Sequence, residues 1–131
     1  MPTQEEFTAA LKAVVQERGD SWIYPSSTEG TRGRHEHAPD WYLNGICRYR
    51  LDDGSPACIV GAALGKLGLL ERVAINSGQG AFQVLGSLGF DRATCRAADA
   101  AQGMQDMGET WGEALKDYLA VLHLELDEAA A

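Results

Sequence analysis

Apolar residues recur at three- and four-residue spacing near the start of the chain, which is the period of an amphipathic helix. The positions that set this pattern are Phe7, Ala10, Leu11, Val14 and Val15. Thr3 and Glu6 match a capping box in front of them, and Gly19 is placed to end the helix. The pattern therefore predicts a helix over residues 4–18.

The second half of the chain shows the same period. We expect a short helical turn over residues 69–75, a short helix over 81–88 and a longer one over 92–107 capped by Asp91. Thr110 and Glu113 repeat the capping-box pattern before a final helix over residues 111–127. One face of that helix is formed by Trp111, Leu115, Tyr118, Leu119, Leu122 and Leu126.

The most uniformly apolar segment lies at residues 56–67 and predicts a buried helix, because a helix that is apolar on most sides has no face for water. Ser55 is a suitable N-cap and Pro56 suits the first helical position. Gly61 and Gly65 would let another helix approach closely. We therefore predict an all-α fold of five or six helices around this central helix 56–67.

Residues 20–55 show neither the spacing of a helix nor the clear alternation of a strand. Residues 22–24 and 46–51 have strand character and could pair into a small two-stranded element within 22–50. Between them, residues 26–40 are rich in Ser, Thr, Gly, Pro and charge. We interpret them as an exposed loop of a single domain over residues 1–131, and loops of this length often carry function.

Two segments are similar to motifs in small uncharacterised proteins of actinobacterial phages. Residues 49–61 read YRLDDGSPACIVG, and residues 105–115 read QDMGETWGEAL. The matching motifs are Asp-Gly-x-Pro-x-Cys-Ile-Val-Gly and Gln-Asp-x-Gly-x-x-Trp-Gly, and the similarity spans roughly residues 41–119. The chain is also similar, more weakly, to actinobacterial domains of unknown function. Both resemblances imply a small helical domain, and neither implies an activity.

Composition narrows the function classes. The chain is 45% hydrophobic and 23% charged, the balance of an ordinary globular protein. Its net charge of −8 argues against general nucleic-acid binding. The sequence has no apolar run of membrane-spanning length and no secretory pattern at its N-terminus. Three cysteines without a Cys-x-x-Cys pair predict reduced thiols and a cytoplasmic location.

The acidic charge gathers near the C-terminus. Residues 109–131 contain a single basic side chain, Lys116. Their acidic side chains are Glu109, Glu113, Asp117, Glu125, Asp127 and Glu128. Such a segment can attract a basic partner, or it can simply be a solvated helix face.

Cys58 is the strongest candidate for catalytic chemistry, because a helix N-terminus lowers the pKa of a thiol. Its apolar neighbours favour the alternative that it packs in the core. His35 and His37 with Cys47 and Cys58 lack the spacing of a zinc site, so neither a metal nor a cofactor is predicted. Asp52-Asp53 and the pair Asp106 and Glu109 are interpreted as turn and cap residues.

Basic and aromatic side chains collect in the middle of this acidic chain, a combination that suits a binding surface. The candidate binding residues are Arg32, Arg34, His35, His37, Trp41 and Tyr42. The alternative is a small second core of aromatic residues with solvated arginines. We expect a non-enzymatic binding protein, a phage accessory protein that contacts a host cytosolic protein. The competing hypothesis is a small ligand-binding or thiol-dependent enzyme that uses Cys58 or the Arg/aromatic region 22–50.

Overall fold

The fold is built from helices. The computed structural model describes residues 3–24, 49–50, 56–73 and 79–130. In these ranges the chain forms the α-helices α1 (Gln4–Arg18), α4 (Ile59–Lys66), α5 (Ala81–Ser87), α6 (Arg92–Asp106) and α7 (Trp111–Ala130), and the 3₁₀ helix η2 (Leu70–Arg72). No β-strand occurs among these residues, and one isolated antiparallel bridge joins Arg50 and Pro56. The predicted all-α class is confirmed.

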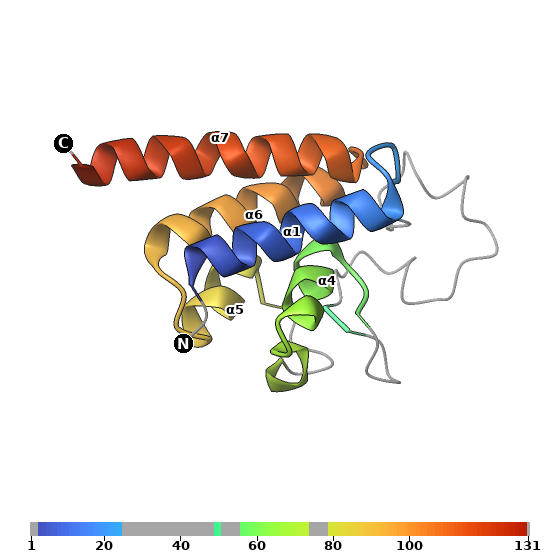
Figure 1. Cartoon of the computed structure of the whole chain (residues 1–131), viewed down its shortest axis with the longest axis horizontal. Coiled ribbons are helices and arrows are strands. Elements are labelled where there is room, and N and C mark those ends of the chain that lie inside the picture. The colour runs from blue at the N-terminus through green and yellow to red at the C-terminus, as the bar shows by residue number, and fades with distance from the viewer. Residues whose placement is uncertain (1–2, 25–48, 51–55, 74–78, 131) are drawn as a thin grey trace.

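The helices α6 and α7 form an antiparallel pair that has the most extensive packing in the fold (Figure 1). Gly108 lies between them with a φ of 90°, a conformation that glycine adopts without strain. α1 packs against α4 and α7, and α5 packs against α6. Figure 1 shows α7 reaching past the other helices at its C-terminal end. It has 20 residues, whereas α1 and α6 have 15 each.

Local capping fixes the ends of α1, as the sequence predicts. The hydroxyl of Thr3 accepts a hydrogen bond from the Glu6 N–H, and the Glu6 carboxylate accepts one from the Thr3 N–H. Gly19 ends the helix with a φ of 98°. Asp91 caps α6 by accepting from the Thr94 N–H at 2.8 Å. The bounds of η2, α5 and α6 also agree with the prediction within a few residues, and α7 extends to Ala130 rather than to residue 127.

The central helix is shorter than predicted. We expected it over residues 56–67 with Pro56 at its first position, whereas α4 begins at Ile59 with Cys58 as its N-cap. The reason is a backbone contact: Pro56 forms a bridge with Arg50, and the Ala57 N–H donates to the Tyr49 carbonyl at 3.1 Å. These bonds hold residues 56–57 in extended pairing. The helix is nonetheless buried between α1 and α6, as expected of a central element.

Gly61 makes a close contact, but its neighbour is not a helix. A Cβ atom at this position would lie 1.9 Å from the Tyr49 carbonyl oxygen, so the backbone of Tyr49 occupies that space. At Gly65 the atoms nearest to a Cβ would be those of Pro56 and Leu70, at ordinary contact distances. The expectation that these two glycines admit another helix is therefore wrong, because the segment before α4 folds back over it.

The described aromatic residues of the segment 22–50, which are Trp22, Tyr24 and Tyr49, pack in or against the main core, whereas Trp41 and Tyr42 lie outside the described residues. Tyr24 and Tyr49 are buried in the same cluster as Phe7, Trp111 and Tyr118. Residues 22–24 form no strand. The other half of the proposed two-stranded element lies mostly outside the described residues, as does the predicted loop over residues 26–40.

Candidate binding surfaces

Gln105, near the end of α6, is the buried polar centre of the fold. Its side-chain oxygen accepts hydrogen bonds from the Ile59 N–H at 2.8 Å and from the Trp111 indole N–H at 3.1 Å. Ile59 is the first residue of α4 and Trp111 the first of α7. One amide oxygen therefore joins three helices and connects the two segments that carry the family resemblance.

The start of α7 is capped by backbone carbonyls from the segment that follows α1. The Trp111 N–H donates to the Trp22 carbonyl and the Gly112 N–H donates to the Asp20 carbonyl, both at 2.9 Å. A Cβ at position 112 would lie 2.7 Å from the Asp20 carbonyl oxygen, so glycine is needed for this approach. The Trp-Gly pair of the motif thus serves to dock α7.

Cys58 is placed in the core. Its side chain is 0% exposed, and its sulfur accepts a hydrogen bond from the Gly61 N–H at 3.4 Å. The sulfur therefore acts as an N-cap acceptor for α4, at a helix end where backbone N–H groups otherwise lack partners. Cys95 is also buried, and burial raises the pKa of its thiol, with a smaller contribution from Asp91. Neither thiol is exposed to a substrate in this conformation.

The side chain of Trp22 forms a bridge between the core and the surface. It packs edge-on against Trp111, with ring centroids 4.5 Å apart, and the guanidinium of Arg18 lies 4.6 Å from the Trp22 ring centroid. An arginine held over an aromatic face is orientated as well as attracted. This arrangement fixes a positive charge at the C-terminal end of α1.

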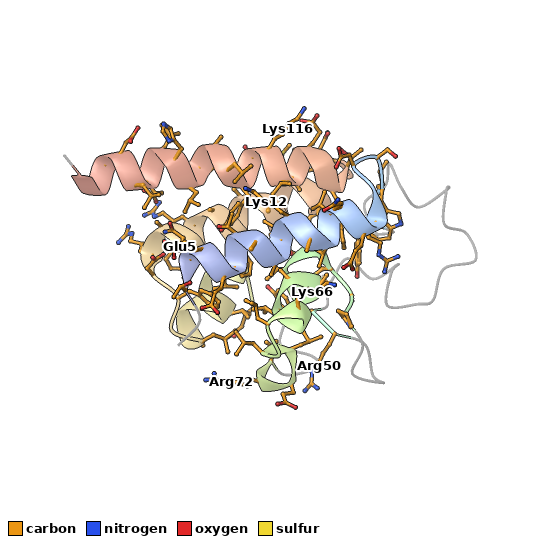
Figure 2. The ribbon with its side chains drawn as sticks, in the orientation of Figure 1. Glu5, Lys12, Arg50, Lys66, Arg72 and Lys116 are labelled. Atoms are coloured by element: carbon orange, nitrogen blue, oxygen red, sulfur yellow. The ribbon has the colours of Figure 1, made fainter. Side chains whose placement is uncertain are left out.

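A pocket of about 360 Å³ opens beside this arginine, between α1, α4 and the start of α7. Its apolar lining is Val14, Pro56, Ala62, Gly65 and Trp111. Its charged lining consists of Glu17, Arg18 and Lys66, and Lys66 forms an ion pair with Glu17 across α1 and α4. Figure 2 labels Lys66 on α4. We call this the α1/α4 pocket. It combines an apolar wall with a few charged groups, as small-molecule sites commonly do.

A second pocket of about 380 Å³ lies between α6 and α7, and its charged groups are balanced. Arg92 and Arg96 face Glu125 and Glu128 across it. The Arg96 guanidinium lies 2.8 Å from the Glu125 carboxylate. This ion pair contributes to holding the C-terminal half of α7 against α6.

The outer surface of α7 carries apolar side chains in contact with water. Leu119, Leu124 and Leu126 are 37%, 61% and 43% exposed. The sequence placed Leu119 and Leu126 on the same apolar face as Tyr118 and Leu122. Tyr118 and Leu122 are buried, whereas Leu119 and Leu126 lie at the edge of that face and remain exposed. At 3.6 residues per turn, Leu119 and Leu126 lie on the same side of α7 and Leu124 lies roughly 140° around the helix from Leu119. We call these three leucines and the acidic side chains of α7 the α7 surface.

The residues predicted to form the binding site are not among those that the structure describes. This applies to Arg32, Arg34, His35, His37, Trp41 and Tyr42, and also to Cys47 and Asp52-Asp53. Of the other carboxylates considered, Asp106 is partly buried. Burial raises its pKa, a hydrogen bond from Gln105 lowers it, and Asp99 raises it further.

Three features of the described site escape sequence reasoning: Gln105, the stacking of Arg18 on Trp22, and the pairing of Lys66 with Glu17. The Gln105 bonds to Ile59 and the Lys66–Glu17 pair join residues far apart in the chain, whereas Arg18 and Trp22 are four residues apart and meet where the chain turns after α1. The only sequence signal for them was the Trp-Gly motif, which marks the position of Trp111 beside all three.

Within the described residues, no three His, Cys, Asp or Glu side chains gather as they would around a metal ion. None of the helices in the described ranges is both long and apolar enough to cross a membrane. Comparisons of the chain with protein-family models, curated proteins and solved structures find no match.

Proposed function

We propose that this chain is a non-enzymatic binding protein, an accessory protein of an actinobacterial phage that contacts a protein in the cytosol of its bacterial host. The observation that carries the proposal is the α7 surface. Leu119, Leu124 and Leu126 remain in contact with water although the domain has an extensive core. Exposed apolar side chains set among charged ones are typical of surfaces that bind other proteins.

The charge of the same helix favours a basic partner. On the side of Leu124, α7 carries Glu113, Asp117, Asp127 and Glu128, whereas its only Lys is Lys116. Opposite charges across an interface accelerate association and select partners. We therefore expect a partner whose contact surface combines Lys or Arg with apolar side chains, and an association that weakens as salt rises over the physiological range, where the screening length is about 8–10 Å.

The arrangement of Cys58 supports binding over thiol chemistry. A nucleophilic thiol must reach its substrate, whereas this sulfur is buried and bonded to the Gly61 N–H. Alkylation of the native protein with iodoacetamide at neutral pH should therefore leave Cys58 unmodified over times that modify it fully in urea. Rapid native modification of Cys58 would favour the thiol-dependent alternative.

Affinity capture from an actinobacterial lysate tests the α7 surface. A Leu119→Ser, Leu124→Ser, Leu126→Ser variant should lose the partner that the parent captures. The matched control replaces two apolar side chains exposed elsewhere, Phe82→Ser and Met107→Ser, and should retain it. Both variants should melt near the parent temperature. Equal capture by all three proteins would contradict the proposal for α7.

The Arg/aromatic residues remain the second candidate surface. They oppose the sign of the whole chain, so they would create a local positive field. We propose that Arg32, Arg34 and Trp41 contribute to partner binding, and that their combined replacement by Ala weakens capture without loss of stability. A variant that melts early would indicate that Trp41 belongs to the core instead.

A further inference from the structure

We infer that the α1/α4 pocket is a binding site for a small organic acid, a carboxylate attached to an aromatic or branched hydrocarbon body. The inference is independent of the proposed protein partner, because it uses a different surface. It rests on three observations of the described residues: the apolar wall of the pocket, the two cations that line it and the exposed position of Gly65 in its lining.

The apolar wall selects the body of the ligand. Pro56 and Ala62 present most of the accessible apolar surface, because Val14 and Trp111 behind them are only 4% and 1% exposed. Among the described residues, Glu17, Arg18 and Lys66 supply the charged lining. The volume of about 360 Å³ lies at the lower end of the range for small-molecule sites. A body the size of a phenyl ring with a short chain therefore suits it.

The rim selects the charge of the ligand. Arg18 and Lys66 come from different helices and are opposed by one carboxylate, Glu17, so the rim has an excess of positive charge in a chain whose net charge is −8. Lys66 is paired with Glu17, while none of the described carboxylates is ion-paired with Arg18. The Arg18 guanidinium carbon lies over the Trp22 ring, and the guanidinium N–H groups are donors that a carboxylate can accept from.

Gly65 provides room for the ligand. The atoms nearest to a Cβ at this position belong to the Pro56 and Leu70 side chains, at 3.6–3.7 Å, so a Cβ fits and a larger side chain would extend into the pocket. Gly86 on α5 is a matched position, since nothing lies within 4 Å of a Cβ there and it is away from the pocket.

The probe is 3-phenylpropionate, and its neutral amide, 3-phenylpropionamide, is the control ligand. Both are titrated into the full-length ¹⁵N-labelled protein and followed by heteronuclear NMR. The acid should bind saturably with a Kd of roughly 1 mM or lower, as expected for a ligand of this size. It should shift the amide signals of Ala62, Gly65 and Lys66, and the amide analogue should bind at least about fivefold more weakly.

Charge variants give effects of opposite sign. Arg18→Gln and Lys66→Met should each weaken binding of the acid by about five- to tenfold. Glu17→Gln should strengthen it several-fold, because the substitution removes the carboxylate that competes for Lys66. Lys12→Met and Glu5→Gln are the controls on α1 and should change nothing. Figure 2 shows Lys12 and Lys66 on opposite sides of α1 and Glu5 near its N-terminal end.

Gly65→Leu should abolish binding by filling the pocket, whereas Gly86→Leu should leave it intact. Equal affinity for the acid and its amide would overturn the inference. So would a Kd that is insensitive to Arg18 and Lys66, or weaker binding in Glu17→Gln. The charged variants alter exposed side chains, so their outcome decides the inference even if Gly65→Leu is unstable.

Discussion

Replacing Gly61 by Ala tests the contact on which the placement of α4 depends. The added methyl group would lie 1.9 Å from the carbonyl oxygen of Tyr49 and 2.7 Å from its carbonyl carbon. Ordinary contacts of a Cβ begin near 3.4 Å. The Tyr49 backbone and α4 must therefore separate by about 1.5 Å, and a well-packed interior resists such a shift.

The size of the effect follows from what holds Tyr49 in place. Its carbonyl accepts from the Ala57 N–H at 3.1 Å, its hydroxyl donates to the Gln79 carbonyl at 2.6 Å, and its ring is buried. Loss of one hydrogen bond costs about 1 kcal/mol and overpacking about 1–3 kcal/mol. Ala gains about 1 kcal/mol over Gly in a helix. The net loss of unfolding free energy should be about 1–3 kcal/mol, or roughly 3–15 °C in Tm.

Urea and thermal unfolding followed by circular dichroism measure this difference. Gly103→Ala on α6 is the matched control, because Gly103 is exposed and nothing lies within 4 Å of a Cβ there. It should stabilise the protein by about 0.5–1 kcal/mol. A Gly61→Ala protein as stable as this control would refute the reasoning, since it would mean that the Tyr49 carbonyl does not lie against α4.

Three further substitutions test the rest of the core. Gln105→Met should lower the unfolding free energy by about 2–5 kcal/mol, because it leaves two buried N–H donors unpaired; the same change at exposed Gln16 should be nearly neutral in urea unfolding. Gly112→Ala should cost about 1–3 kcal/mol in the same assay, because its methyl group meets the Asp20 carbonyl. Asp106→Asn should be more stable than the parent near pH 7, because burial raises the pKa of Asp106 in the folded state. Because the folded state then binds more protons than the unfolded state, the stability of the parent falls as the pH rises above about 4. Below that pH the parent and Asp106→Asn should have similar free energies of unfolding.

The helix boundaries that the sequence predicts well are those set by neighbours in the chain. Thr3 and Glu6 satisfy each other three residues apart, and Asp91 caps α6 through Thr94 in the same way. Gly19 ends α1 because it takes a positive φ that other residues avoid. Each of these bonds is local, so the residues that determine it are visible together in the sequence.

The start of α4 is predicted wrongly because its determinants are not local. Ser55 and Pro56 form a plausible helix start when viewed alone, but pairing of Pro56 with Arg50 removes it from the helix. Gln105 poses the same problem. A glutamine on a helix is usually solvated, and nothing in its neighbourhood reveals that its oxygen serves Ile59, which lies 46 residues earlier.

The α1/α4 pocket was missed for a related reason. Glu17 and Arg18 read as ordinary surface charges at the end of a helix, and Lys66 as the same at the end of another. Only the packing of α1 against α4 places them around one apolar wall. In the sequence, charged and aromatic residues are denser at 26–50, and the role of those residues in partner binding stays a prediction.

The two motif segments have a structural explanation that separates architecture from function. Gly61 admits the Tyr49 backbone, Gln105 joins three helices, and Trp111 and Gly112 dock α7 on the segment after α1. These side chains are buried or in backbone contact, so they are committed to folding and are poorly placed to meet a partner. The motif residues therefore account for the helical framework of this chain. We therefore expect side chains outside the motifs to decide what this chain recognises. Among the described residues, the α7 leucines and the cations of the α1/α4 pocket lie outside the motifs and are exposed.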